Sequence, residues 1–329
     1  MAGNLFISNS SMNNSSQYIL FVKKLLVLVL ILFATDRLIG MLLEKTFYQQ
    51  KRGDAQNTVH LVEEANEDLI IMGSSRASHH YRSDILEKET GLTTFNGGRD
   101  EMVITYIYAT LDLSFQRHKP KVLILDVTPH ELSEDKTTAL VNQRVSTNLI
   151  PFLYKYPRLA AVVDLSDNHE LLKAKVSHIY PYNSLMGTIL QNTYTSIGHS
   201  SQQGYEPLIG TLDSNISKSP QWGEDYPEQR PISETYEDYL LKTVQLAKAS
   251  NVKVVAILSP FYFQLPIDGN NSYKRMKQIF AREQIPFYDY SQNPVFLKNP
   301  LLFRDDVHLN DSGATVFSRE IATIVKNHL

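Results

Sequence analysis

The sequence predicts an α/β fold, a three-layer sandwich with a central parallel sheet, preceded by one N-terminal transmembrane helix. From residue 68 onward, short apolar runs alternate with stretches of helical spacing, which is typical of a parallel sheet covered by helices on both faces. Nearer the N-terminus, residues 25–34 form an unbroken apolar run. Hydrophobic residues make up 43% and charged residues 20% of the 329, so wholesale disorder is excluded.

Charge, cysteine content and missing motifs exclude several classes of protein. A formal net charge of −3 argues against a nucleic-acid binder, which needs a basic surface. The chain has no cysteine, which excludes disulfides, thiolate metal sites and cysteine nucleophiles. His130-Glu131 and His169-Glu170 lack the second histidine of the helical zinc motif, and no phosphate-binding glycine loop occurs. We therefore expect no metal and no cofactor.

The N-terminal part of the chain divides into three expected segments. Residues 1–17 are rich in Ser and Asn without charge and are expected to form a disordered tail. Residues 18–43 are expected to span the membrane as a signal anchor, since ten apolar residues are too short but residues 25–43 rise about 28 Å. Asp36 and Arg37 would then lie near the far end of the span. Residues 44–66 are polar and charged and are expected to form a stalk.

Two other interpretations of the apolar segment stay open, a cleaved signal peptide and a buried amphipathic helix. The sequence at residues 33–36 is a poor cleavage site, and a ten-residue aliphatic run is hydrophobic all round rather than amphipathic. We favour the anchor. Positive charges on its two sides nearly balance, so charge does not orient it.

The remaining elements follow in order within one domain, expected at residues 67–329. Strands are predicted at residues 69–72, 122–125, 252–258 and 286–288, with a short one ending near Phe95. Helices are predicted at residues 102–115, 236–249, 273–283 and 316–328. Residues 133–232 break this rhythm, being helical at first and then rich in loop-forming residues. We expect them to form an insertion.

Ser75 is a candidate nucleophile because of its place after the first predicted strand. In Ile71-Met72-Gly73-Ser74-Ser75-Arg76, the glycine lets the chain turn at the carboxyl edge of the sheet, where α/β sites lie. A serine that begins a helix there can aim its own backbone N–H at a developing oxyanion. The alternative is a plain turn.

Asp305 and His308 are the candidate partners of that serine. They lie three residues apart just before the last predicted helix. A serine nucleophile needs an imidazole base, and the base needs a carboxylate that fixes its tautomer. The alternative is that the Asp pair and Asn310 only cap the helix.

Together the two motifs resemble the SGNH/GDSL hydrolase superfamily, whose fold is a flavodoxin-like sandwich. The resemblance implies that Ser75 is the nucleophile, His308 the base and Asp305 the orienting acid. The Gly-Ser-Ser form is similar to membrane-anchored branches of the superfamily that act in O-acylation of extracytoplasmic polysaccharides. Two features depart from the superfamily: Ser74 replaces the Asp of Gly-Asp-Ser, and residues 125–131 lack the Gly-x-Asn-Asp block.

A third motif, residues 95–100, is similar to the superfamily's second block. The resemblance implies that the N–H of Gly98 joins that of Ser75 in the oxyanion hole, and Asn96 is the candidate for the missing asparagine. Arg76 is expected to bind an anionic group of the substrate or, alternatively, to form an ion pair at the rim of the site.

Two functions remain from the sequence. The first is a membrane-anchored serine esterase or O-acyltransferase that acts on acyl esters of glycans. We expect the acyl group to be acetyl. Its domain would lie on the extracytoplasmic (periplasmic) side of the cytoplasmic membrane, with a membrane O-acyltransferase as a possible partner. The second is a catalytically inactive module of the same fold that binds glycan or assembles with such an acyltransferase.

Overall fold

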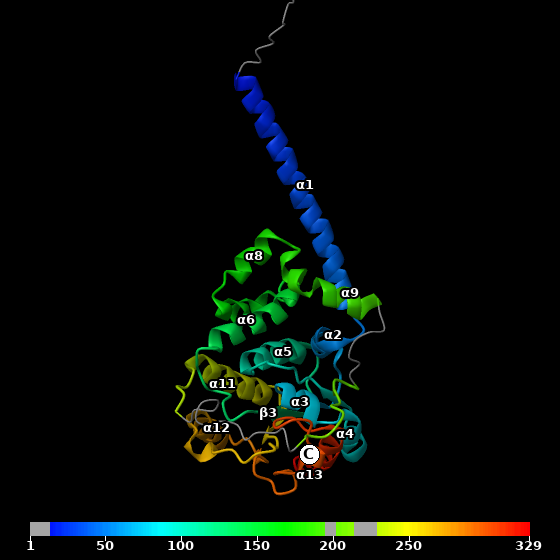
Figure 1. Cartoon of the computed structure of the whole chain (residues 1–329), viewed down its shortest axis with the longest axis vertical. Helices are drawn as coiled ribbons and strands as arrows, with labels where there is room; N and C mark the ends of the chain where they lie inside the picture. The colour runs from blue at the N-terminus through cyan, green and yellow to red at the C-terminus, as the bar shows by residue number, and fades with distance from the viewer. Residues whose placement is uncertain (1–13, 195–201, 214–228) are drawn as a thin grey trace, which may run out of the picture.

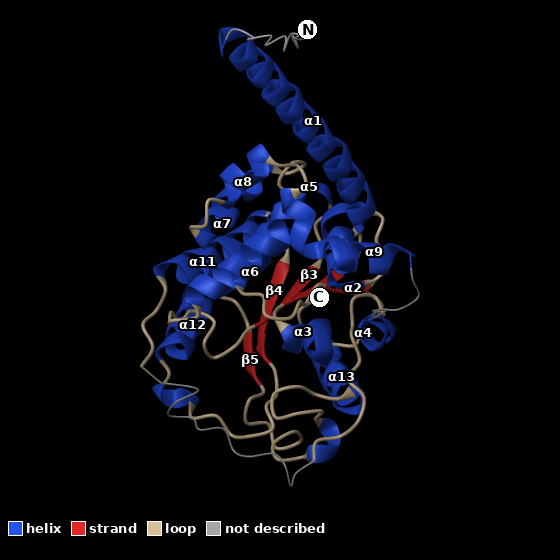
Figure 2. Cartoon of the chain, turned by 45° about the horizontal axis from the view of Figure 1, so that its top comes forward, coloured by secondary structure: helices blue, strands red, loops and turns tan. Residues whose placement is uncertain are grey.

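A five-stranded parallel sheet forms the centre of the molecule, as the computed structural model of residues 14–194, 202–213 and 229–329 shows (Figures 1 and 2). The strands are β1 (Leu69–Met72), β2 (Thr94–Asn96), β3 (Val122–Asp126), β4 (Lys253–Leu258) and β5 (Phe287–Asp289). They pair in the order β2-β1-β3-β4-β5. The predicted α/β class with a central parallel sheet is confirmed.

Helices cover both faces of this sheet and so make three layers. One face carries α5 (Ile104–Arg117), α11 (Glu234–Ala249) and α12 (Asn271–Arg282), and the other carries α3 (Ser75–His80), α4 (Ser83–Thr90) and α13 (Asp311–Asn327). In β1, Ile70 and Met72 pack into the core on the α5 face of the sheet, whereas Leu69 and Ile71 pack into the core on the α13 face. All four are fully buried, which explains why the strand is a continuous apolar run.

Three helices begin earlier than their apolar spacing predicted, because a polar residue caps each of them. Ser233, Asn270 and Asn310 each accept a hydrogen bond from the backbone N–H three residues further on, at the start of α11, α12 and α13 respectively. Such a bond satisfies one of the free donors of a helix N-terminus. A helix was expected to begin at Ser75, as α3 does, but the end of α3 and the short helix α4 were not predicted, since neither helix has an apolar stripe long enough to be recognised.

The segment expected as an insertion is helical in its first part. It contains α6 (Thr138–Leu149), η2 (Ile150–Phe152), η3 (Pro157–Leu159), α7 (Ala160–Val163), η4 (Asp164–Ser166), α8 (Glu170–Val176), η5 (Tyr180–Leu185) and α9 (Met186–Tyr194). The later part lies partly outside the described residues. Its described piece, 202–213, runs beside the edge of the sheet, where the Gln203 carbonyl accepts a hydrogen bond from the Asn96 N–H at 2.9 Å.

A single long helix, α1 (Asn14–Tyr48), projects from the domain (Figure 1). It is long and apolar enough to cross a membrane, with a mean hydropathy of 2.3 over its 18-residue window. The apolar side chains from Tyr18 to Phe33 are exposed to the surroundings. Most of the expected tail, residues 1–13, lies outside the described residues.

Residues 44–66 do not form the expected stalk. Phe47 is buried at the end of α1, and α2 (Gly53–Val59) and the π-helix η1 (His60–Glu64) follow it against the domain. Leu61 and Val62 belong to the same core as α5. Charged residues on either side of these short apolar groups conceal their burial from a reading of periodicity.

Candidate active site

Ser75 is the first residue of α3, directly beyond the tip of β1. Gly73 is required at this turn by close packing: a Cβ there would lie 2.7 Å from the Asp126 carbonyl oxygen and 2.8 Å from the Cβ of Ala77. The glycine therefore lets α3 approach β3 closely, which sets Ser75 at the carboxyl edge of the sheet. This is the edge at which α/β folds hold their sites.

The structure brings Ser75, His308 and Asp305 into one hydrogen-bonded chain. Ser75 Oγ lies 2.8 Å from His308 Nε2, and His308 Nδ1 lies 3.0 Å from Asp305 Oδ2. A carboxylate only accepts hydrogen bonds, so the imidazole proton sits on Nδ1. Nε2 is then left to accept the hydroxyl proton of Ser75.

Asp305 is held as a carboxylate by its own loop. Its Oδ1 accepts hydrogen bonds from the backbone N–H groups of Val307 and His308 at 3.0 and 2.8 Å. Burial raises the pKa of Asp305, but these bonds and the His308 ring outweigh burial and lower the pKa below its ordinary value. The acid therefore stays ionised and can orient the imidazole.

A second histidine, His80, fixes the position of the His308 loop. It is fully buried, and its Nε2 accepts a hydrogen bond from the Leu309 N–H at 3.0 Å. Burial holds the pKa of His80 well below its ordinary value, so the ring is neutral and its Nε2 is available as an acceptor. Asn310 caps α13, as the alternative interpretation expected. Asp305 is instead hydrogen-bonded to His308.

The expected oxyanion donors Gly98 and Asn96 are not available, and this expectation is corrected. The Gly98 N–H donates to Asn96 Oδ1 at 2.9 Å. Asn96 Nδ2 donates to the carbonyl oxygens of Ala77 and Tyr81 at 2.7 and 2.9 Å, and the side chain is fully buried. These groups brace β2 against α3. Of the expected donors, only the Ser75 N–H remains, in the first turn of α3.

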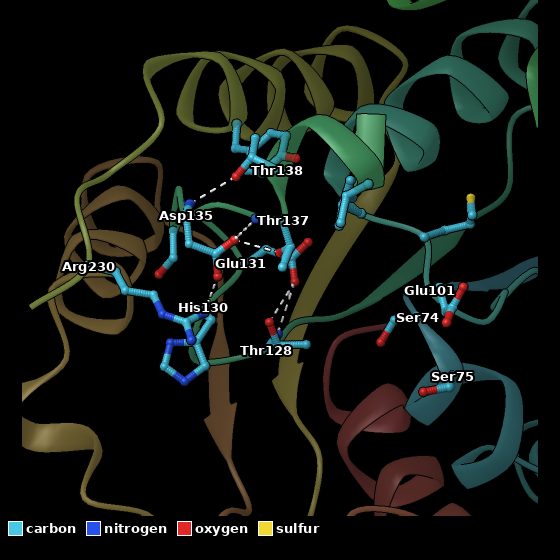
Figure 3. A pocket seen from close by; sticks show the side chains of 15 residues that line it. Ser74, Ser75, Glu101, Thr128, His130, Glu131, Asp135, Thr137, Thr138 and Arg230 are labelled. Carbon is cyan, nitrogen blue, oxygen red and sulfur yellow. Dashed lines mark hydrogen bonds and ion pairs between the residues drawn. The ribbon is translucent and has the colours of Figure 1, made fainter. Parts of the chain in front are cut away.

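The hydroxyl of Ser74 lies beside the site, and the sequence reasoning gave it no role. Ser74 precedes α3, makes no side-chain capping bond, and lines both cavities beside Ser75. Figure 3 shows the hydroxyls of Ser74 and Ser75 on the same side of the cavity.

Arg76 lines one of the two cavities beside Ser75, but its polar contacts are made within the protein. Its Nη2 donates to the Val127 carbonyl at 2.7 Å and lies 3.7 Å from Asp126 Oδ1, and its guanidinium stacks over Phe261 at 4.2 Å. The side chain is 4% exposed. The structure therefore favours the ion pair over substrate binding, with the pair buried under the site and not at its rim.

Two cavities meet at Ser75. Both are lined by Ser74, Ser75, Thr128 and His130. The first, of about 290 Å³, continues to polar side chains that include Glu131, Asp135, Thr137, Thr138 and Arg230 (Figure 3). The second, of about 270 Å³, passes His308 and is lined by the apolar groups of Pro129, Phe261 and Val307.

Glu131 is the most perturbed acid of the polar cavity. Its Oε2 accepts hydrogen bonds from the N–H and Oγ1 of Thr128 at 3.1 and 3.2 Å. Burial nevertheless raises its pKa to about 7. The neighbouring Asp135 instead forms an ion pair with Arg230 at 2.7 Å. The polar cavity thus offers one carboxyl group that changes its charge near neutral pH.

The residues of this cavity were missed because they come from separate stretches of sequence. The one usable signal was position: residues 128–131 directly follow the predicted strand at 122–125, and parallel strands end at the site edge. His130-Glu131 was considered as an incomplete zinc motif and as part of the stretch that lacks the Gly-x-Asn-Asp block, and neither view gave it a role in the site.

Comparison with solved structures finds matches of low similarity. No protein-family model matches the chain, and no curated protein matches it. A candidate lipolytic protein of the G-D-S-L family from Desulfitobacterium hafniense DCB-2 is similar with TM-score 0.38 and 9% identity, over 78% of this chain and 99% of that one. A candidate acylhydrolase from Bacteroides fragilis NCTC 9343 has TM-score 0.38 and 12% identity, over 83% and 95%. An acetyl xylan esterase has TM-score 0.38 and 13% identity, over 79% and 99%.

Proposed function

We propose that this chain is a membrane-anchored serine esterase or O-acyltransferase of the SGNH type, acting on acyl esters of extracytoplasmic glycans. The observation that carries the proposal is the hydrogen-bonded chain from Ser75 Oγ through His308 to Asp305. Ser75 follows the end of β1, and His308 lies on the loop before α13. These are the places where the resemblance puts the nucleophile and the base.

The proposed reaction has two halves that share one base. In the first, Ser75 Oγ attacks the ester carbonyl while His308 Nε2 takes its proton, then returns that proton to the leaving alcohol. In the second, His308 deprotonates water or a sugar hydroxyl, whose oxygen attacks the acyl-serine, and His308 returns that proton to Ser75 Oγ as the acyl–Oγ bond breaks. Water gives hydrolysis and a sugar hydroxyl gives transfer, so the triad alone fits both.

We propose two donors for the oxyanion. The Ser75 N–H lies in the first turn of α3, where backbone donors are not used within the helix. The Ser74 hydroxyl faces the same cavity (Figure 3). Donors aimed at the developing charge are a large part of acyl-transfer catalysis.

The cavities support a polar substrate. His308 must protonate the oxygen of the leaving alcohol, and it lines the second cavity. Hydroxyl, carboxyl and guanidinium groups line the polar cavity, which suits hydrogen-bonding groups better than a long aliphatic chain.

The placement of the domain belongs to the same proposal. We place α1 in the cytoplasmic membrane and the domain on its extracytoplasmic (periplasmic) side, where glycans carry acyl esters. In the transfer case, a membrane O-acyltransferase that delivers the acyl group is the expected partner. The long exposed apolar helix α1 supports the membrane placement.

A second function, a non-catalytic module that binds glycan or assembles with an acyltransferase, is favoured by one observation. The Gly98 N–H and the Asn96 amide donate their hydrogen bonds within the fold, so the oxyanion hole lacks two of its expected donors.

The experiment uses the full chain in detergent micelles beside its Ser75→Ala variant. Release of acetate from an acetylated oligosaccharide and transfer of label to an unacetylated one are measured together. We expect one of the two activities in the wild type and neither in the variant. Glycan binding by both proteins with no turnover in either would support the second function instead.

A further inference from the structure

A small apolar face on α8 lies at the end of the domain from which α1 projects (Figures 1 and 2). Leu172 and Val176 are one helical turn apart, so they share a face, and their exposed fractions are 60% and 67%. The lysines Lys173 and Lys175 stand beside them and are also exposed.

Polar residues of α1 hold this helix in place. Arg37 Nη2 donates to the carbonyl oxygens of Lys175 and Val176, at the C-terminus of α8, at 3.4 and 3.2 Å. Asp36 Oδ2 accepts a hydrogen bond from the His178 N–H at 2.8 Å. The C-terminal end of α8 therefore sits at the level of residues 36 and 37 of α1.

The length of helix needed to span a membrane places residues 36 and 37 of α1 within the bilayer. A hydrocarbon core of about 30 Å needs about 20 helical residues. Counted from the end of the Lys23-Lys24 pair, 20 residues reach Glu44, well past Arg37. The face of α1 turned away from the domain agrees, since Leu38 and Leu42 are apolar and exposed.

We infer that the tip of α8 inserts Leu172 and Val176 into the leaflet next to the domain, as a second membrane contact beside α1. Apolar side chains then lie among the acyl chains, while Lys173 and Lys175 reach the headgroups. Two backbone carbonyls accept from Arg37 Nη2, and Asp36 lies 3.8 Å from its Nη1, so the charge of Arg37 is partly compensated at membrane depth. With α1 as the one membrane contact, the molecule could tilt against the bilayer, and the second contact limits that tilt. The inference rests on the proposed anchor.

The absence of cysteine makes the test direct, because one introduced cysteine carries one label. Full-length Leu172→Cys and Val176→Cys variants carry an environment-sensitive fluorophore in phosphatidylethanolamine–phosphatidylglycerol vesicles with a doxyl-lipid quencher. Leu28→Cys, in the middle of α1, is the control for the anchor. Leu301→Cys, on η7 (Pro300–Leu302) and 68% exposed, is the control for a surface site in water.

We expect blue-shifted emission and several-fold quenching at positions 28, 172 and 176, and neither at 301. Quenching at 28 with positions 172 and 176 behaving like 301 would overturn the inference and leave the anchor intact. No quenching at 28 would overturn the anchor itself. The vesicles hold no other protein. A face that needs a protein partner would therefore give quenching at position 28 and none at positions 172 and 176.

Discussion

The Oγ of Ser75 lies 2.8 Å from the Nε2 of His308, although 233 positions separate the two residues in the sequence. The contact exists because α13 packs against α3 on one face of the sheet. Arg82 adds to this packing through its Nη1, which lies 2.9 Å from Asp311 at the start of α13. The packing of α3 against α13 thus brings Ser75, at the start of α3, close to His308 on the loop that leads into α13.

Asp305→Ala is expected to lower kcat by about 10³- to 10⁴-fold with little change in KM, because the imidazole loses its tautomer and orientation. Acyl-ester turnover under saturating substrate checks this. Asp306→Ala changes the neighbouring carboxylate and serves as the matched control, with near wild-type turnover expected. Equal losses in the two variants would assign the effect to the loop and not to the acid.

Ser74→Ala is expected to lower kcat by about 100-fold, since one hydroxyl donor is lost from the proposed oxyanion hole. Stability should stay within about 0.5 kcal/mol, because Ser74 makes no capping bond. Steady-state kinetics and urea unfolding are measured on the same preparation. A stability loss near 1 kcal/mol with unchanged kcat would make Ser74 a helix cap only.

Arg76→Met is expected to destabilise the fold by about 3 kcal/mol or more, because it leaves Asp126 buried beside no cation. Denaturant unfolding checks this. A variant as stable as the wild type with a raised KM would restore the substrate-binding role expected from the sequence.

Glu131→Gln is expected to change how stability depends on pH. The ordinary pKa of Glu131 is 4.5, and burial raises it to about 7 in the fold. Below pH 4.5 both states hold the proton. As the pH rises toward 7 the unfolded chain releases it first, so the wild type loses stability over this window. The Tm of the variant minus that of the wild type should grow from pH 4.5 to 7 and then level off. A difference that is constant with pH would contradict the raised pKa.

The sequence was sufficient where a signal is local and repeated. The strand at residues 69–72 is wholly apolar because both its faces are buried, and Ser75 follows it at a fixed offset. Asp305 and His308 sit on one short loop, so their mutual contact follows from spacing alone.

The sequence was insufficient where a polar group could bond to any of several partners, because the folded backbone decides which partner is in reach. Whether the Gly98 N–H faces a substrate or Asn96 depends on the local backbone, which turns it to the asparagine. The partners of Arg76 lie 50 or more residues further along the chain, at Asp126 and Val127. Residues 44–66 join the core through a few apolar groups set among charges.

The central claim is that Ser75 is an activated nucleophile. The most direct measurement adds a serine-reactive fluorophosphonate probe to the full chain in detergent and to its Ser75→Ala variant, with intact mass as the readout. We predict one covalent adduct on the wild type and none on the variant. A folded wild type that takes no adduct, or a variant that still takes one, would contradict the account.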